Sequence, residues 1–563
     1  MLFIPALRNA VTSADRRSLA PMVAAAITLA VGSALILYGA FRGLDLTDET
    51  FYLISINDPG AYALSYQPFG HVLAPLFALL DRSLPALRIV TFIAVVAAGS
   101  LLGHHCGRYA GLGSMALAGA ASSLALYFSW IITPNYNLLA NVGLALIIAG
   151  VLAGPWRVGA LLIGVGGYLV FFGKPTTAAL AALILAALLA VPRVRREQRL
   201  LLRGAMAGAI AFILIVATVG LDLVGFVGNI LAAQDTLGLS NSLGALPLKT
   251  AHELYDAPPL LLVAATVTLG VFVTPRSEAW KFIILPLIAA ALLVLAFRTL
   301  QGFTIHPRPT EFGLTMTALC LLAIALAVSL SGAPKSSFAL PVALVLAPYV
   351  VAFGTFNDIL EQTTGSLLFP ILALCLVARL AAWPALELAT YALALACLLI
   401  GFFRPYGYAA PVFAQSEALR TRLFKGPLLV DPMTKDYADS LGRVGVDAPI
   451  LDLTGNGPGT VALTGAKAPV LPWIITLTPQ WADVVWNRLP TRDQAWIIGP
   501  VAPAFANSAA ARHMREGNYR CSSLAPMKFW DRIQLITLCK PASLSPPSRP
   551  RTAVRSPPTT RRR

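Results

Sequence analysis

The chain has 563 residues, of which 57% are hydrophobic and only 12% are charged, and its formal net charge is +16 at pH 7. Soluble domains carry about 25% charged residues, so this composition excludes an ordinary soluble protein. Apolar runs long enough to cross a bilayer recur along the chain and predict a polytopic α-helical membrane protein. The positive charge falls mainly in short loops between these runs and in the last residues, which argues against nucleic-acid partners.

Hydropathy predicts about thirteen transmembrane helices within residues 1–403. They are expected at residues 19–41, 84–103, 112–132, 136–153, 158–173, 176–191, 204–222, 258–274, 281–297, 311–331, 338–354, 366–380 and 384–403. The first is too long for a cleavable signal peptide and is interpreted as a signal anchor.

The charges between the spans set the expected orientation. Basic residues collect on one side, above all in residues 193–203, whereas acids collect on the other, as in residues 45–49. Short loops rich in Arg and Lys stay in the cytoplasm, so the N-terminus is predicted to be cytoplasmic. With an odd number of spans, everything after residue 403 is then extracytoplasmic.

The first extracytoplasmic loop, residues 42–83, carries the strongest functional signal. Asp48 and Glu49 follow the first span, and carboxylates at a membrane face are costly unless they have a task. One of them can serve as a general base, with Asp48 preferred and Glu49 as runner-up or orienting partner. Capping of an interfacial helix by residues 47–50 is the structural alternative.

Cations at the outer ends of later spans are candidates for holding a phosphate group. Lys174 follows the fifth span and Arg308 precedes the tenth, with Arg298 in reserve. Either cation could pair with a phosphate through charge-assisted hydrogen bonds. For Lys174 the alternative is a side chain that reaches from a span end to the membrane surface.

Three polar side chains are candidate substrate-binding residues: Tyr52, His71 and Asn137. For His71, a place on the polar face of an amphipathic helix is favoured over acceptor binding. Asn137 and Asn141 share one face of a span, where hydrogen bonds between helices are slightly favoured over a sugar pocket.

Residues 404–540 differ in texture, because charged residues return and apolar runs shorten to strand length. Strands are predicted at 427–432, 449–454, 495–500 and 532–538, with helices near 480–488 and 504–515. This alternation predicts a small extracytoplasmic α/β domain. The loop Thr454–Gly459 is interpreted as a turn, with a phosphate cradle as the alternative. Residues 541–563 form a basic tail with the composition of disorder.

The six cysteines fall into two groups. Four lie in or beside spans and are expected to pack as small apolar side chains: Cys106, Cys320, Cys375 and Cys397. Cys521 and Cys539 lie in the C-terminal domain, where an extracytoplasmic location allows a disulfide; the sequence leaves the bonded and free forms equally open. No spacing indicates a zinc site.

The motifs together resemble the membrane glycosyltransferases of the GT-C architecture, in particular bacterial aminoarabinose transferases and relatives of the protein O-mannosyltransferases. The family has an acidic motif in its first extracytoplasmic loop, here Asp48-Glu49-Thr50-Phe51-Tyr52, then an interfacial helix with proline and aromatics, here residues 67–80. A span that begins with Leu-Arg follows, as at Ala86-Leu87-Arg88. A glycine-rich span ends at Lys174, and Ile305–Pro309 matches the family's late basic motif without its usual tyrosine.

This resemblance implies a glycosyltransferase of a bacterial inner membrane, one that inverts the anomeric carbon. It would take a sugar from a polyprenyl-phosphate donor and transfer it to an extracytoplasmic lipid, glycan or protein. No cofactor is expected; carboxylates near a phosphate could hold a divalent metal, although no ligand set is evident. The alternatives are a transporter or flippase for lipid-linked glycans and a non-catalytic protein of envelope assembly.

Overall fold

The computed structural model describes residues 16–62, 68–153, 156–190, 198–219, 224–226, 228, 309–331, 333–353, 359–444, 448–466, 470–471, 473–474, 479–489, 492–517, 519–529 and 532–542. Arg298, Arg308, the predicted spans at 258–274 and 281–297, and the predicted tail from residue 543 onward lie outside these residues.

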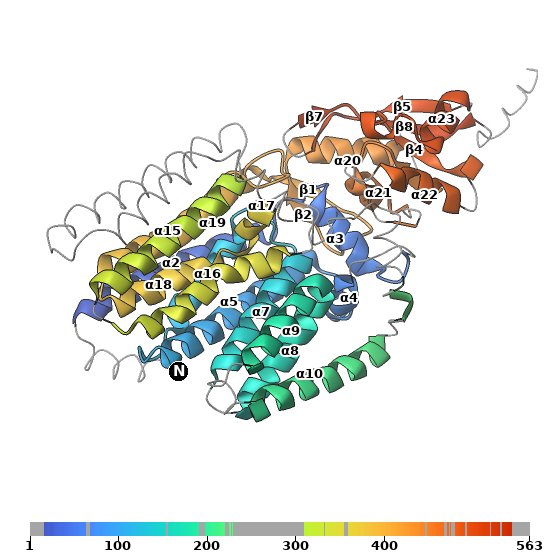
Figure 1. Cartoon of the computed structure of the whole chain (residues 1–563). Coiled ribbons are helices and arrows are strands. Elements are labelled where there is room, and N and C mark those ends of the chain that lie inside the picture. The colour runs from blue at the N-terminus through green and yellow to red at the C-terminus, as the bar shows by residue number, and fades with distance from the viewer. Residues whose placement is uncertain are drawn as a thin grey trace, which may run out of the picture.

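Most of the described chain forms a bundle of apolar helices (Figure 1). The bundle comprises α2 (Arg16–Gly39), α5 (Leu84–Tyr109), α6 (Ala116–Ser123), η1 (Leu124–Tyr127), α7 (Tyr136–Leu152), α8 (Trp156–Gly173), α9 (Pro175–Ala190), α10 (Gln198–Val219), α15 (Pro309–Leu330), η3 (Lys335–Phe338), α16 (Ala339–Ala352), α17 (Ile359–Thr363), η4 (Thr364–Ser366), α18 (Leu368–Leu380) and α19 (Pro384–Phe403).

Within the described residues, five helical segments are long and apolar enough to cross a membrane. They are Leu19–Gly39, Leu84–Tyr109, Trp156–Gly173, Lys335–Ala352 and Pro384–Phe403. Other apolar segments of the described chain are shorter, among them Tyr136–Leu152 and Leu368–Leu380. The structure is therefore mostly helical and contains candidate membrane spans, as predicted. The predicted count of thirteen spans is not confirmed.

The predicted span at 112–132 shows why a hydropathy count differs from the helices that form. Ser122 and Ser123 donate to carbonyls of the preceding turn, and the helix tightens into η1 and ends at Tyr127. Trp130 then adopts a left-handed backbone, with φ of 59°. Apolar composition continues here without a continuous helix.

Close packing of α7 on α8 sets the geometry of the bundle near the site. A Cβ atom on Gly143 would lie 2.6 Å from the carbonyl oxygen of Gly166, and one on Gly166 would lie 2.5 Å from that of Gly143. Only glycine allows the two backbones to approach so closely, as small residues do at membrane helix interfaces.

The short helices α3 (Asp48–Asn57) and α4 (Phe69–Leu79) lie between the bundle and the C-terminal domain (Figure 1). The domain contains helices α20 (Pro432–Val444), α21 (Pro458–Thr464), α22 (Gln480–Arg488) and α23 (Ala509–Glu516), and strands β1 (Glu417–Leu419), β2 (Leu428–Val430), β3 (Ile450–Asp452), β4 (Trp496–Gly499), β5 (Tyr519–Ser523), β6 (Met527–Phe529), β7 (Arg532–Gln534) and β8 (Thr537–Pro541).

The main sheet of this domain has the strand order β3-β4-β8-β5, in which β3 and β4 are parallel and β8 is antiparallel to both neighbours. The predicted C-terminal region with strands and helices is therefore present. The strand predicted at 532–538 is wrong as one element: β7 pairs with β6 in a separate hairpin, and the chain then enters β8.

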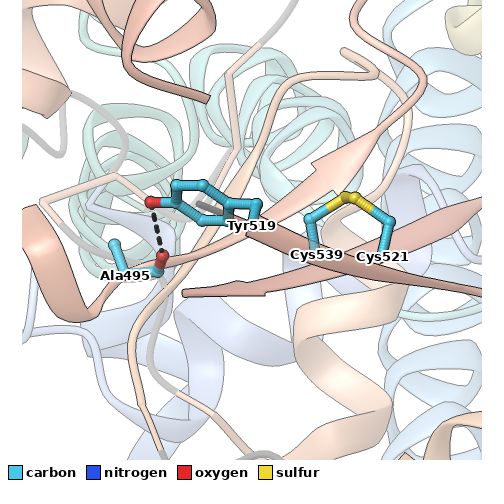
Figure 2. Close-up of a disulfide and its surroundings, with 4 residues drawn as sticks. All are labelled: Ala495, Tyr519, Cys521 and Cys539. Atoms are coloured by element: carbon cyan, nitrogen blue, oxygen red, sulfur yellow. Dashed lines mark hydrogen bonds between the residues drawn. A yellow bond between two sulfur atoms is a disulfide. The ribbon is translucent and has the colours of Figure 1, made fainter. Parts of the chain in front are cut away.

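A disulfide joins Cys521 and Cys539, which face each other directly on β5 and β8 (Figure 2). Of the two forms that the sequence left open, the structure has the bonded one. The other four cysteines are buried and free, as expected for apolar packing.

Main-chain hydrogen bonds attach the C-terminal domain to the loop after α2. The amide of Leu429 in β2 donates to the carbonyl of Phe41, and the amide of Gly43 donates to the carbonyl of Leu429. The amide of Gly459 in α21 donates to the carbonyl of Leu46. The domain therefore packs directly against the segment that leads into α3.

Candidate functional site

The N-terminus of α3 is capped by an acid that precedes the helix. The Asp45 carboxylate accepts hydrogen bonds from the backbone amides of Thr47, Asp48 and Glu49, and from the Thr47 hydroxyl. Burial and the charge of Glu49 raise the pKa of Asp45 to about 6. Capping thus occurs here, as the structural alternative proposed, but Asp45 supplies it rather than residues 47–50.

Glu49 forms a completely buried ion pair with Arg88. The guanidinium of Arg88 lies 3.1 and 3.2 Å from the two carboxylate oxygens, and neither side chain is exposed. Glu49 also accepts from the amide of Thr133, the amide of Asp45 and the hydroxyl of Tyr408. A buried charge requires such partners, and this carboxylate is occupied on both oxygens.

Arg88 connects several segments at this end of the bundle. Besides Glu49, it donates to the Thr133 hydroxyl before α7 and to the carbonyls of residues 40, 42 and 43 after α2. Tyr408, which donates to Glu49, lies just after α19 at the start of the C-terminal domain. We call Glu49, Arg88, Thr133 and Tyr408 the Glu49 junction.

Asp48 has a different environment from its neighbour. It is half-buried, whereas Glu49 is fully buried, because successive helical residues point about 100° apart. One turn further along α3, Tyr52 lies on the same face as Asp48. Burial and the nearby charge of Asp48 raise the pKa of Tyr52.

Aromatic rings continue from Asp48's face of α3 toward α7 and the C-terminal domain. The ring centroid of Tyr52 lies 5.8 Å from that of Tyr136 and 5.9 Å from that of Phe69. On the other side, Phe51 lies 5.8 Å from Trp473 of the C-terminal domain. The site is thus bordered by α3, α4, α7 and one residue of the C-terminal domain.

Lys174 lies beside this aromatic group. Gly173, at the end of α8, approaches the carbonyl of Tyr136 so closely that a Cβ would lie 2.7 Å from it. The ammonium of the next residue, Lys174, lies 5.4 Å from the Tyr136 ring centroid, within cation–π range. Contacts therefore lead from Tyr52 through Tyr136 to Lys174, and Asp48 lies one helical turn before Tyr52.

The ammonium of Lys174 is buried and donates to the carbonyl of Val351 at the C-terminal end of α16, 3.1 Å away. A cation is favourable at a helix C-terminus, so the position has a structural role. A lysine ammonium has three N–H donors. No carboxylate within the described residues forms an ion pair with Lys174.

The remaining predicted residues lie around this site to different degrees. His71 is half-buried on α4, and Asn137 is half-buried in the first turn of α7. The Asn141 side chain donates to the carbonyl of Gly365. This hydrogen bond joins two elements of the bundle, which is the role that the sequence slightly favoured over a sugar pocket.

The loop Thr454–Gly459 has its amides engaged within the protein. The amides of Thr454 and Gly457 donate to the Asp452 carboxylate, while that of Gly459 donates to Leu46. The loop acts as a turn that docks α21 next to α3.

In the described part of the chain, no group of three or more His, Cys, Asp or Glu residues could hold a metal ion.

The sequence did not predict the two partners of Glu49. Arg88 was expected only as part of the Leu-Arg motif, and Tyr408 was not expected in the site. An arginine inside an apolar span requires a buried acid partner, and that requirement could have paired Arg88 with the acids of residues 45–49. Nothing in the local sequence around Tyr408 indicates its partner, which lies 359 residues away.

Comparison of the whole chain with known protein families, curated proteins and solved structures finds no match in any of the three.

Proposed function

We propose that the chain is a membrane glycosyltransferase that moves a sugar from a polyprenyl-phosphate donor to an extracytoplasmic acceptor. Asp48 is the general base and Lys174 binds the donor phosphate. The acceptor is a lipid, glycan or protein hydroxyl. The membrane is a bacterial inner membrane, with the N-terminus in the cytoplasm and the C-terminal domain outside.

One observation carries the proposal: a half-buried acid and a buried lysine without a described acidic partner lie at the two ends of one row of neighbouring side chains. Asp48 lies one helical turn before Tyr52, and contacts lead from Tyr52 through Tyr136 to Lys174. Asp48 and Lys174 are 126 positions apart in the sequence, and the fold brings them to the same end of the bundle. Sugar transfer from a phosphate needs a base and a positive group in one place.

The chemistry divides between these two side chains. The Asp48 carboxylate takes the proton from the acceptor hydroxyl as the oxygen bonds to the anomeric carbon. The bond between that carbon and the phosphate oxygen breaks, and the polyprenyl phosphate leaves with the bonding electrons. The Lys174 ammonium offsets the charge that develops on the leaving phosphate. Arg308 is a further candidate for this phosphate.

Glu49 has a supporting part in this scheme. Its two oxygens accept from Arg88, Tyr408 and two backbone amides, so it holds the start of α3 in place. We assign it an orienting role for Asp48. Tyr52, His71 and Asn137 remain candidates for contacts with the donor sugar or the acceptor.

The disulfide supports the proposed side of the membrane for the C-terminal domain. Disulfides such as Cys521–Cys539 persist in oxidising compartments and are rare in the cytoplasm.

The test is transfer by the purified protein in lipid nanodiscs, with a polyprenyl-phosphate sugar labelled in the sugar and an envelope extract as acceptor. The proposal expects labelled acceptor and free polyprenyl phosphate, both lost on heat inactivation. In sealed vesicles, a flippase would instead move the intact labelled donor across the bilayer. Absence of transfer and of donor cleavage with every sugar offered would reject the enzyme assignment.

A further inference from the structure

Exposed aromatic side chains gather where two membrane-type helices end. Tyr38 lies in the last turn of α2 and Phe41 follows it, while Phe403 ends α19. Phe413 lies ten residues later in the C-terminal region, in η5 (Val412–Ala414), and is 53% exposed; Phe403 is 51% exposed. Large apolar side chains are rarely left in water as a contiguous group without a partner.

Three of these rings, those of Tyr38, Phe403 and Phe413, are connected through the buried Phe402. Its ring centroid lies 6.0 Å from that of Tyr38 and 6.4 Å from that of Phe413. Phe403 and Phe413 are 5.8 Å apart. The first residues after α19 therefore pack back onto the ends of the helices, so α2, α19 and η5 share one surface.

Two arginines lie within the same group. The guanidinium of Arg42 stacks 3.8 Å from the Tyr38 ring centroid, and its Nη1 atom donates to the Tyr38 carbonyl, 3.2 Å away. Arg404 is exposed directly after Phe403. Neither arginine forms an ion pair with an acid among the described residues. Aromatics beside unpaired arginines at span ends match the headgroup region of a bilayer, which offers both apolar contact and phosphate.

We propose that Tyr38, Phe41, Arg42, Phe403, Arg404 and Phe413, together the Phe413 surface, lie in the lipid headgroup region of the leaflet next to the C-terminal domain. Arg42 and Arg404 bind phospholipid phosphates. The Phe413 ring enters the membrane boundary and fixes the height of the C-terminal domain above the bilayer. Exposed apolar side chains of the candidate span α2, among them Val31 and Leu37, lead into this surface, so the bilayer is its natural occupant.

The depth of the Phe413 surface also sets the depth of the acidic helix. Arg88 binds the carbonyl of Arg42 and the carboxylate of Glu49, so Arg42 and the start of α3 are held together. Asp48 is then placed near headgroup level. This inference does not depend on the proposed enzyme activity.

The experiment is a measurement of membrane depth with spin labels in nanodiscs that contain phosphatidylglycerol and phosphatidylethanolamine. Phe413→Cys carries the label, and Glu417→Cys, an exposed position on β1, is the control. The four free native cysteines are buried. We expect the ratio of oxygen to aqueous nickel accessibility to be higher at 413 than at 417. Equal, water-like ratios at both positions would overturn the proposal.

A second pair of variants keeps the test decisive if Phe413→Cys does not fold. Phe41→Cys samples the same surface from the segment directly after α2 and is expected to show the same lipid contact. In native mass spectrometry, the double variant Arg42→Gln and Arg404→Gln is expected to lose phospholipid that the unaltered protein retains. Retention unchanged in the double variant would contradict phosphate binding by these arginines.

Discussion

Two buried glutamates in this protein each accept hydrogen bonds from one arginine and one tyrosine. The partners of one are close to it in the sequence, and the partners of the other are distant. Glu387 accepts from Arg379 at 2.9 Å and from Tyr391 at 2.8 Å, residues eight and four positions away. Glu49 accepts from Arg88 and Tyr408, which are 39 and 359 positions away. The first trio joins α18 to α19 within one helical hairpin, whereas the second joins α3, α5 and the C-terminal domain.

The difference shows how one chemical solution serves two tasks. A local trio satisfies a buried charge and stabilises the hairpin that contains it. A long-range trio makes the position of α3, and with it Asp48, depend on distant parts of the chain. Damage to the Glu387 trio is therefore expected to lower stability alone, and damage to the Glu49 junction to lower stability and activity together.

The largest effect is expected from removing the cation of the Glu49 junction. Arg88→Met leaves Glu49 as an uncompensated buried charge, which typically costs about 3–5 kcal/mol. Arg379→Met is the matched control and is expected to cost less, because the Arg379 side chain is 22% exposed and water can reach the site. Unfolding in mixed detergent micelles measures both, and equal destabilisation would contradict the comparison.

The next largest effect is expected from substitution of Lys174. This buried cation has no described acidic partner, whereas Arg88 and Arg379 each pair with a glutamate. Lys174→Met removes the proposed phosphate contact, and hydrogen bonds to charged groups contribute about 1.5–3 kcal/mol, roughly 10- to 100-fold in donor affinity. Donor binding to the purified variant is the measurement. If the variant is less stable but its folded fraction binds the donor with unchanged affinity, Lys174 does not bind the phosphate. Its role is then limited to the hydrogen bond at the C-terminal end of α16.

A smaller effect is expected from the two tyrosines. Tyr408→Phe and Tyr391→Phe each delete one hydroxyl that donates to a buried glutamate, at a cost of about 1.5 kcal/mol. Only Tyr408→Phe should also speed proteolysis around residues 404–416 and reduce turnover, since only Tyr408 belongs to the C-terminal domain. Similar proteolysis and turnover in the two variants would show that the Glu49 junction does not couple the domains.

The smallest perturbation tests the side of the membrane. Ser416→Cys adds a thiol at an exposed position near β1 and is expected to leave stability unchanged. In intact cells stripped of their outer membrane, an impermeant maleimide should label it. Labelling only after permeabilisation would place the C-terminal domain in the cytoplasm and remove the proposed orientation.

The sequence predicted the elements whose signals are local. Hydropathy located the apolar helices, and amphipathic spacing placed a helix at 480–488, the bounds of α22. It failed where a local signal competes with packing. The predicted span at 112–132 breaks after Tyr127, and the strand at 532–538 divides into β7 and β8.

The site was predictable by residue type and not by partner. Asp48, Glu49 and Lys174 were selected because charge at a membrane boundary is costly. Which acid would be buried and which half-exposed depends on Arg88 and Tyr408, whose contacts with Glu49 arise only from the tertiary fold. The cap formed by Asp45 was also missed, although it lies only three residues before Asp48.

Turnover of Asp48→Asn measures the central claim most directly. The substitution keeps the size of the side chain and removes the basic carboxylate, so we expect transfer to fall about 10²- to 10⁴-fold with donor affinity and expression nearly unchanged. Asp58→Asn, an exposed acid at the other end of α3, is the control and should retain full turnover. Near-normal transfer by Asp48→Asn would contradict the account; collapse in Glu49→Gln alone, at unchanged stability, would move the base to Glu49.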